Sequence, residues 1–239
     1  MKTAERGITL KKLYSGKTKD VYDLGDGRYL LEFKDSATFG ADGKPDPGAN
    51  QVGGTIEGLG QASLRLSKYF FEKLNAAGLF THYIDSDLEA GTMTVRPAAL
   101  FGGKAGLEVI CRLRATGSFI RRYGNYCVEG QELDHFVEVS LKDDGRGDPM
   151  ISREALDMLN ILTPAEYDDL AARAKQATAI ISEDLSAKGL TLYDIKFEFG
   201  RIDGKVALID EFSWGIMRVY KDDKWLQPFE LLEYYRAFL

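Results

Sequence analysis

The late stretch YDIKFEFGRIDGKVALIDEF carries acidic side chains at positions that suit magnesium–nucleotide chemistry. Side chains alternate between the two faces of a strand, so Asp194, Lys196 and Glu198 are predicted to share one face. The apolar run that follows predicts a buried strand, which delivers Asp210 to the rim of the sheet. Mg²⁺ binds one or two carboxylates together with phosphate oxygens. The alternative is a surface hairpin with weakly stabilising ion pairs, which a buried strand ending in Asp-Glu makes less attractive.

The segment YSGKTKDVY places a glycine and two lysines between strand-like runs. Gly16 permits close approach of the backbone to a ligand, and Lys17 and Lys19 are predicted to point to one face of a strand, where they would cover phosphates. The segment is not a Walker A loop, because the pattern GxxxxGK[ST] is absent. Taken alone, these residues favour the alternative of a solvated lysine pair on an edge strand.

Four arginines surround a Gly-Ser turn in CRLRATGSFIRRYG. They are Arg112, Arg114, Arg121 and Arg122, and Ser118 lies between the two pairs. Guanidinium groups bind phosphate bidentately, and a serine hydroxyl adds a donor. A phosphate-ester site and a surface salt-bridge network explain this cluster equally well.

The acidic loop LKDDGRGDPM contains Asp143, Asp144 and Asp148. It lacks the spacing and the closing glutamate of an EF-hand Ca²⁺ loop. Two interpretations stay open: the loop is a polar turn, or it supplies carboxylates to a metal or an amine.

The overall charge excludes some partners. The 239 residues include 31 Lys and Arg against 37 Asp and Glu, a net charge of −6. This charge argues against a nucleic-acid surface but allows a local cationic pocket. No segment is apolar enough to span a bilayer and no export signal is visible, so we expect a cytoplasmic protein without a membrane partner. Cys111 and Cys127 are expected to be free thiols, and the presence of only two histidines argues against a histidine-based metal site.

The elements that must position these residues do not follow a regular βαβ order, which indicates an α+β fold. Strands are predicted over residues 19–24 and 28–35 around the turn GDG, within 81–100, at the start of 107–124, and in a hairpin over 191–212. A loop is predicted over residues 41–54. Helices are predicted over residues 55–78, 152–162, 163–189 and 227–239, with a short one after the Gly-Ser turn. Thr163 and Glu166 form a predicted capping box, and a lobe boundary is expected near residues 95–107.

Together, these motifs resemble the SAICAR synthetase family nearly end to end. The resemblance is carried by LYSGKTKDVY, FKDSATFGADG, CRLRATGSFIRRYG, LKDDGRGDPM, LYDIKFEFGRIDGKVALIDEFS and Arg218, in the family's order and approximate spacing. It implies an ATP-grasp-like or kinase-like α+β fold with two lobes that enclose an ATP cleft. Residues 1–100 would form an antiparallel β lobe with one long helix, and residues 101–239 an α+β lobe that carries the metal and substrate sites.

The same resemblance implies a reaction of purine biosynthesis. ATP would phosphorylate the carboxylate of carboxyaminoimidazole ribonucleotide (CAIR), and the amine of L-aspartate would attack the acyl phosphate. A carboxylate is a poor electrophile until its oxygen becomes a good leaving group, and lysines and Mg²⁺ offset charge during the transfer. The implied cofactors are ATP and Mg²⁺, and the family resemblance also implies a homo-oligomer.

The resemblance implies roles in binding the ATP phosphates and the metal for some of the matching residues. Gly16, Lys17 and Lys19 would cover the phosphates, with Lys17 also catalytic. Glu198 and Asp210 would be the metal carboxylates, with Asp210 and the adjacent Lys196 acting in catalysis.

The remaining implied roles concern adenine and the acid substrate. Adenine would lie against Val21 and the linker from Arg96 to Leu107. The ribonucleotide substrate would contact the residues Arg112, Ser118 and Arg218, and Asp144 would lie near the metal or the incoming amine.

One departure from the family pattern affects the acceptor side. Trp214 and Gly215 replace the usual Pro and Asp, so one cleft carboxylate is missing. Two alternatives therefore stay open: a related carboxylate–amine ligase with another acid or amine, and a nucleotide-binding protein without turnover. The presence of Lys17, Glu198 and Asp210 favours a catalyst.

Overall fold

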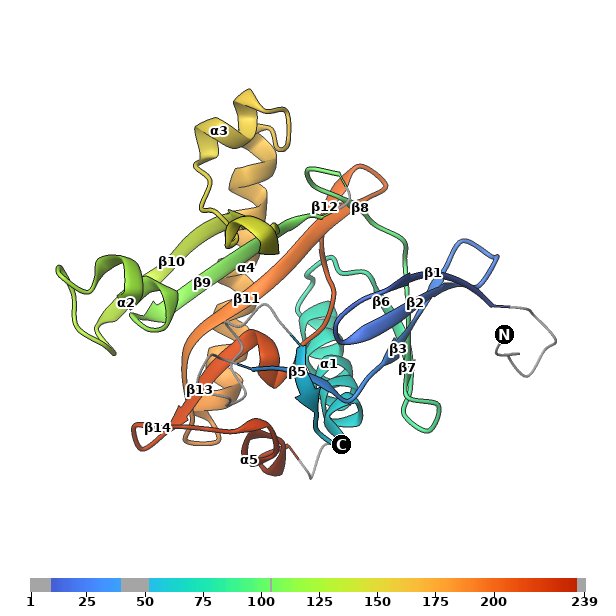
Figure 1. The fold of residues 1–239 in the computed structure, drawn as a ribbon, viewed down its shortest axis with the longest axis horizontal. Helices are drawn as coiled ribbons and strands as arrows, with labels where there is room; N and C mark the ends of the chain where they lie inside the picture. The colour runs from blue at the N-terminus through green and yellow to red at the C-terminus, as the bar shows by residue number, and fades with distance from the viewer. Residues whose placement is uncertain (1–9, 40–51, 104, 236–239) are drawn as a thin grey trace.

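Two large antiparallel sheets dominate the described part of this computed structural model, residues 10–39, 52–103 and 105–235 (Figure 1). The first sheet has the strand order β1-β2-β3-β7-β6. Its strands are β1 (Lys11–Ser15), β2 (Lys19–Asp23), β3 (Tyr29–Phe33), β6 (Tyr83–Asp87) and β7 (Thr92–Val95). The predicted turn between β2 and β3 is confirmed, and Gly25 and Gly27 supply its positive φ angles of 77° and 81°.

The second sheet is built around the long strand β11. Its strand order is β10-β9-β11-β13-β14, and β8 and β12 also pair with β11. The strands are β8 (Ala99–Leu100), β9 (Leu107–Arg114), β10 (Glu132–Leu141), β11 (Thr191–Ile202), β12 (Lys205–Ile209), β13 (Met217–Lys221) and β14 (Lys224–Trp225). Because β11 pairs with β9 over Asp194–Glu198 and with β12 over Glu198–Ile202, Glu198 lies where three strands meet.

A third, two-stranded sheet corrects one boundary. It consists of β4 (Ser36–Thr38) and β5 (Val52–Thr55), so the predicted loop over 41–54 ends in a strand, and residues 40–51 lie outside the described part. The long helix that follows begins at Leu59, not at Thr55. Gly58 precedes it with a φ of 80°, a left-handed conformation that cannot continue a helix.

Five α-helices complete the described part of the chain. They are α1 (Leu59–Ala76), α2 (Ser118–Tyr123), α3 (Arg153–Met158), α4 (Pro164–Ser186) and α5 (Pro228–Glu233), and 3₁₀ turns occur at Asp144–Arg146 and Trp214–Ile216. The predicted capping box is confirmed: Thr163 Oγ1 accepts from Glu166 N at 3.2 Å, and Thr163 N donates to Glu166 Oε2 at 2.9 Å. Across the described residues, no helix combines the length and apolar character needed to cross a membrane.

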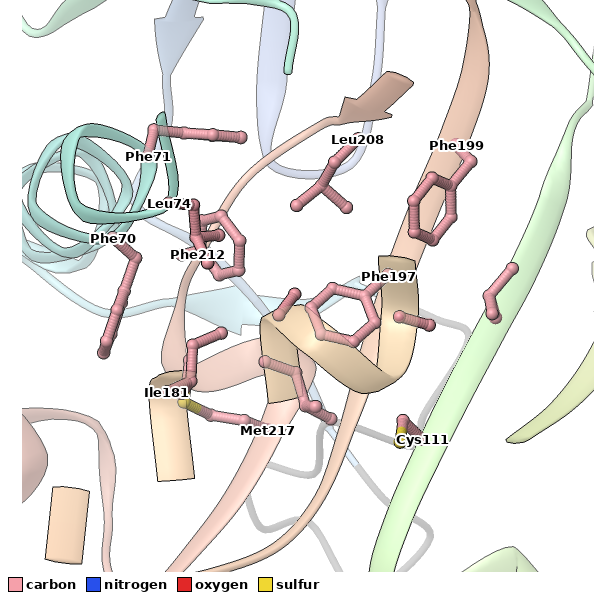
Figure 2. Close-up of a cluster of buried hydrophobic side chains, with 14 of the residues drawn as sticks. Phe70, Phe71, Leu74, Cys111, Ile181, Phe197, Phe199, Leu208, Phe212 and Met217 are labelled. Atoms are coloured by element: carbon pink, nitrogen blue, oxygen red, sulfur yellow. The ribbon is translucent and has the colours of Figure 1, made fainter. Parts of the chain in front are cut away.

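Helix α1 joins the hydrophobic core to the hairpin that ends at Asp210 (Figure 2). Its fully buried Phe70 and Phe71 pack against Phe212, and the rings of Phe71 and Phe212 meet edge-on at 4.7 Å. Ser67 Oγ donates to the Phe212 carbonyl and accepts from its N–H, both at 2.9 Å. The helix therefore fixes the backbone directly after Asp210.

The two sheets are also connected by main-chain contacts. The backbone of Thr81 bridges to Leu208 of β12, and His82 N donates to the Leu208 carbonyl at 2.9 Å. Strand β8, at Ala99–Leu100, already belongs to the second sheet. The division into lobes at residue 100 stays a prediction, while the α+β class with antiparallel sheets is confirmed.

Candidate active site

A cleft of about 1030 Å³ is bounded by the first sheet and by the β11–β12 hairpin. We call it the main cleft. Its apolar wall comes from β2 and β3 and includes Val21, Leu31 and Phe33. Its charged wall contains five lysines and six carboxylates: Lys17, Lys19, Lys34, Lys142, Lys196, Glu108, Asp143, Asp144, Glu198, Asp210 and Glu211. An apolar wall beside a strongly charged one suits a ligand with a flat ring and several phosphates.

The turn between β1 and β2 brings two lysines into the main cleft. Gly16 N donates to the Lys19 carbonyl at 2.7 Å, which closes the turn tightly. Lys17 lies in this turn and Lys19 begins β2, so the prediction that both point from one face of a strand is wrong. Lys17 Nζ lies 2.7 Å from Asp144 Oδ2, and Lys19 Nζ lies 2.9 Å from Asp210 Oδ1. The turn nevertheless directs both ammonium groups to carboxylates across the cleft.

Lys19 is only 7% exposed, so the alternative of a solvated lysine is wrong for Lys19, whereas the Lys17 side chain is 39% exposed. Its Nζ also donates to Glu211 Oε2 at 2.6 Å, and Ser213 Oγ donates to Glu211 Oε1 at 2.9 Å. Burial lowers the pKa of Lys19, but the charges of Asp210 and Glu211 outweigh burial and hold the pKa above its ordinary value. Glu211 is a partner that the sequence motif contained without assigning it a role.

Glu198 and Asp210 are neighbouring carboxylates on the β11–β12 hairpin. Glu198 pairs with Ile209, and Asp210 follows with a φ of 75°, a conformation that Asp tolerates better than most residues. Burial and the charge of Asp210 raise the pKa of Glu198 to about 7, although Lys142 donates a hydrogen bond to it. Burial also raises the pKa of Asp210, but Lys19 and Lys142 outweigh burial and lower it. The two acids therefore repel each other and depend on nearby positive charge.

A smaller cavity of about 180 Å³ is lined by Arg112, Ser118, Arg121, Arg122 and Arg218, and we call it the arginine cavity. Arg112 is 1% exposed, and it donates to Asp194 Oδ2 at 2.6 Å and to Ser118 Oγ at 2.8 Å. Arg218 donates to the same Asp194 oxygen at 3.0 Å. The cluster is therefore a partly buried network of ion pairs and hydrogen bonds around Asp194.

Glu138 is a second buried acid that contacts arginines of this cluster, and no sequence motif indicated it. Its carboxylate accepts from Arg112 Nε at 2.8 Å and from Arg122 at 2.6 Å. The side chain of Arg112 is thus held by two carboxylates, Glu138 and Asp194, and its contact with the ribonucleotide stays a prediction. Arg114 points elsewhere, since it donates to Glu132 and to the Gly130 carbonyl at 3.0 Å each.

The two cavities adjoin. Glu108, Lys196 and Ile216 line both the main cleft and the arginine cavity. Lys196 Nζ donates to Glu108 Oε1 at 2.8 Å across the β9–β11 pair. A group that lies at this junction can be reached from both sides, which is what transfer between two bound substrates requires.

The carboxylates of the acidic loop make two different kinds of contact. Asp143 N donates to Asp148 Oδ1 at 2.8 Å, and Asp148 has a φ of 49°, so these two acids close the turn. Asp144 faces the main cleft and pairs with Lys17. Lys142, which the sequence reasoning missed, reaches Glu198 from the same loop.

Only part of the predicted adenine site lines the main cleft. Val21 and Arg96 contribute to the wall, and the Arg96 guanidinium lies 5.2 Å from the centre of the Phe80 ring. Leu107 does not: it is 1% exposed and packs in the hydrophobic core with Val109. Leu107 belongs to a strand whose alternate residues face inward, and this geometry corrects its predicted contact with the nucleotide.

Trp214 and Gly215 have different surroundings. Trp214 is buried, its Nε1 donates to the Leu226 carbonyl at 2.7 Å, and its ring stacks on Trp225 at 5.6 Å. Gly215 lines the main cleft. Trp214 also lines the main cleft, so the departure from the family pattern sets a hydrogen-bonded aromatic ring next to a residue without a side chain in the cleft wall.

Comparisons with known proteins agree on one family. The sequence model of SAICAR synthetase matches residues 12–230. The chain is 59% identical over 221 residues to a phosphoribosylaminoimidazole-succinocarboxamide synthase of Clostridium tetani, covering 92% of this chain and 96% of that protein. The identity to the enzyme of the same name from Methanoculleus marisnigri is 35% over 210 residues, 87% of this chain and 81% of that one.

Solved structures give the same result. A structural-genomics structure described as a SAICAR synthetase superposes with a TM-score of 0.79 at 30% identity, covering 94% of this chain and 98% of that one. A structure titled SAICAR synthetase (Type-2) in complex with ADP superposes with a TM-score of 0.80 at 29% identity, covering 94% of both chains.

Proposed function

The chain belongs to the SAICAR synthetase family, and from this premise we propose how its two cavities carry out the family's reaction. The protein is an ATP-dependent carbon–nitrogen ligase that forms SAICAR in purine biosynthesis. The substrates that we assign to it are CAIR and L-aspartate. ATP converts the CAIR carboxylate into an acyl phosphate, and the aspartate amine then displaces phosphate to form the amide.

One observation carries this proposal: the main cleft and the arginine cavity share Glu108, Lys196 and Ile216. A triphosphate in the charged part of the main cleft would place its terminal phosphate toward this junction. A ribonucleotide whose phosphate is bound among arginines would place its carboxylate there from the other side. Lys196 then lies beside the group that is transferred, where an ammonium offsets developing negative charge.

We assign the ATP phosphates to Gly16, Lys17 and Lys19. A Cβ at Gly16 would lie 3.2 Å from the Lys19 carbonyl oxygen, which is tighter than an ordinary van der Waals contact, so a side chain would crowd this turn. Adenine would lie on the apolar wall at Val21 and near Arg96. The structure of a SAICAR synthetase in complex with ADP supports the proposal that this cleft binds a nucleotide.

The residues present fit Mg²⁺. Glu198 and Asp210 are adjacent acids whose mutual repulsion, together with burial, keeps the pKa of Glu198 near 7. Among the described residues no group of three or more His, Cys, Asp or Glu side chains forms a metal site. Two carboxylates suit a cation that takes its other ligands from phosphates and water. Bound there, Mg²⁺ would neutralise charge on the phosphate oxygens.

The arginine cavity would bind the ribonucleotide substrate. Arg218 and Ser118 offer donors to a phosphate, with Arg112 orienting both through Asp194 and its own hydrogen bond to Ser118. Asp144, paired with Lys17 in the main cleft, is placed to attract the ammonium group of aspartate. Self-association and a cytoplasmic location stay predictions, and sedimentation of the purified protein checks the first.

The test is release of ADP in a coupled assay. We expect ADP only when CAIR, L-aspartate and Mg²⁺ are supplied with ATP. ADP release with ATP-binding protein and a different acid or amine, but not with this pair, would favour a related ligase. Gly215 is the observation that supports that second candidate, because it leaves a gap in the cleft wall where the family pattern has a carboxylate.

A further inference from the structure

Lys142 forms an ion pair with Glu198, one of the proposed metal carboxylates. It follows β10, and its backbone N–H donates to the Gly106 carbonyl at 3.3 Å. Its ammonium donates a hydrogen bond to Glu198 Oε1. The Glu198 side chain is 15% exposed and that of Lys142 is 36% exposed, and both residues line the main cleft.

The ammonium of Lys142 faces three carboxylates from three segments. Burial lowers its pKa, but the charges of Glu198, Asp210 and Glu108 outweigh burial and raise it above the ordinary value. The three acids come from β11, from the residue after β12 and from β9. A positive group at this position offsets the repulsion between Glu198 and Asp210, which is also what a divalent cation would do.

Lys142 differs from Lys19 in what it would lose when a cation binds. Lys19 contacts Asp210 but also donates to Glu211 at 2.6 Å, so it keeps a carboxylate partner if Asp210 binds a metal. Within the described residues, the hydrogen bonds and ion pairs of the Lys142 ammonium go to Glu198 alone. A dication on Glu198 would repel this ammonium, and an incoming phosphate would attract it.

We propose that Lys142 is an exchangeable counter-ion, which neutralises Glu198 before the divalent cation binds and moves to a phosphate oxygen when the cation takes that carboxylate. No covalent bond changes in this exchange: Glu198 trades an ammonium for a cation, and Lys142 trades a carboxylate for a phosphate. The inference rests on the proposed function, because it requires Glu198 and Asp210 to bind the cation.

The experiment measures Mn²⁺ binding without nucleotide, by the electron paramagnetic resonance signal of free Mn²⁺ in mildly alkaline buffer. Lys142→Met should bind Mn²⁺ at least about tenfold more tightly than the wild type, because the competing ammonium is gone. The same variant should bind ATP more weakly, because a phosphate partner is lost. Lys142→Gln, which keeps a polar side chain, is a second variant with the same expected changes.

Two matched controls remove one positive charge elsewhere. Lys196→Met removes an ammonium from the same cleft, but one whose partner is Glu108, and Lys205→Met removes one from the exposed start of β12. Lys205→Met should change Mn²⁺ affinity by less than about threefold, because an exposed charge is screened by salt. Lys196→Met should change it clearly less than Lys142→Met does, because its ammonium pairs with Glu108 and not with Glu198. Adding Glu198→Gln to Lys142→Met should abolish the gain.

The outcomes separate the inference from the function on which it rests. Equal Mn²⁺ affinity in Lys142→Met, Lys142→Gln and the wild type would overturn the exchange and leave the metal site intact. Failure of Mn²⁺ to bind any of them, even with ATP present, would overturn both. If Lys196→Met increased Mn²⁺ affinity as much as Lys142→Met does, the increase would follow from the loss of any positive charge in the cleft. That result would also overturn the exchange.

Discussion

The guanidinium of Arg218 lies directly against Gly117: a Cβ built on Gly117 would stand 2.8 Å from the Arg218 Cζ. Gly117 has a φ of 54° and precedes Ser118 at the start of α2. The Gly-Ser turn therefore does more than connect β9 to α2. It leaves the space in which Arg218 reaches Asp194 at the edge of the arginine cavity.

Gly117→Ala should displace the guanidinium of Arg218. The KM for CAIR should then rise by roughly tenfold, since a hydrogen bond to a charged group contributes about 1.5–3 kcal/mol. The KM for ATP should stay within about twofold, because the main cleft is untouched. Steady-state kinetics with each substrate varied in turn measures both. Gly25→Ala is the matched control, because Gly25 has a φ of 77° but no atom within 4 Å of its Cβ position. If Gly25→Ala raised the KM for CAIR as much as Gly117→Ala does, the effect would be due to backbone strain and not to the displacement of Arg218.

Arg218→Ala should weaken the ribonucleotide substrate much more than ATP. The expected rise in the KM for CAIR is roughly tenfold to a hundredfold, since a hydrogen bond to a charged group contributes about 1.5–3 kcal/mol. Arg114→Ala is the control, because Arg114 binds Glu132 and lies outside the arginine cavity. If ATP and CAIR were weakened equally by Arg218→Ala, the assignment of Arg218 to the ribonucleotide would be wrong.

Asp210→Asn should reduce kcat by at least about a hundredfold, because a carboxylate that contributes to metal binding supports several kcal/mol of charge stabilisation. Asparagine tolerates the positive φ of Asp210, so the fold should survive. Asp203→Asn makes the same substitution at an exposed turn of the same hairpin, also at a positive φ, and should leave kcat unchanged. Circular dichroism checks folding, and wild-type turnover in Asp210→Asn would defeat the assignment.

Asp184 predicts a pH dependence of stability away from the active site. Its carboxylate accepts hydrogen bonds from Lys73 and Lys188 at 2.6 Å, and from Tyr69 at 2.6 Å and Tyr235 at 2.9 Å. Burial raises the pKa of Asp184, but these four donors outweigh burial and lower it to about 2. Because the folded pKa lies below the unfolded value of about 3.9, the stabilisation is complete above about pH 4 and is lost as the pH falls toward 2.

Asp184→Asn should therefore lower the free energy of unfolding by about 2 kcal/mol at neutral pH. It should also flatten the dependence of that free energy on pH between about 4 and 2. Urea titrations at a series of pH values measure both effects. Asp169→Asn, on the same helix, changes a half-exposed acid that pairs with Arg173 and should have little effect. A wild-type pH slope in Asp184→Asn would contradict the assignment.

The sequence predicts local elements well where a local signal exists. The β2–β3 turn follows from its two glycines, and the start of α4 follows from Thr163 and Glu166. The predicted start of α1 is too early, because the apolar spacing continues upstream of Gly58, whose left-handed backbone cannot continue the helix. The pairing of β9 with both β10 and β11 has no local signal, since it depends on contacts between distant segments.

The same limit explains which site residues escaped prediction. Glu138 is one of several charged residues in an alternating strand, and only the pairing of β10 with β9 brings it to Arg112. Lys142 belongs to a loop with several charged residues, and the sequence does not distinguish it from them. Only its hydrogen bond to Glu198 in the folded chain indicates a place in the site. The alternation of Leu107, Val109 and Cys111 along the chain predicts one inward face of a strand, which argues against a contact between Leu107 and the nucleotide. In the structure all three side chains are buried.

The central claim is that Glu198 and Asp210 hold a divalent cation against the triphosphate of ATP. Crystals grown with Mn²⁺ and a non-hydrolysable ATP analogue test it most directly, because anomalous scattering locates Mn²⁺ independently of the protein atoms. The account predicts one strong anomalous peak in contact with both carboxylates and with phosphate oxygens. Nucleotide bound in the cleft with no anomalous peak at these two side chains would contradict it.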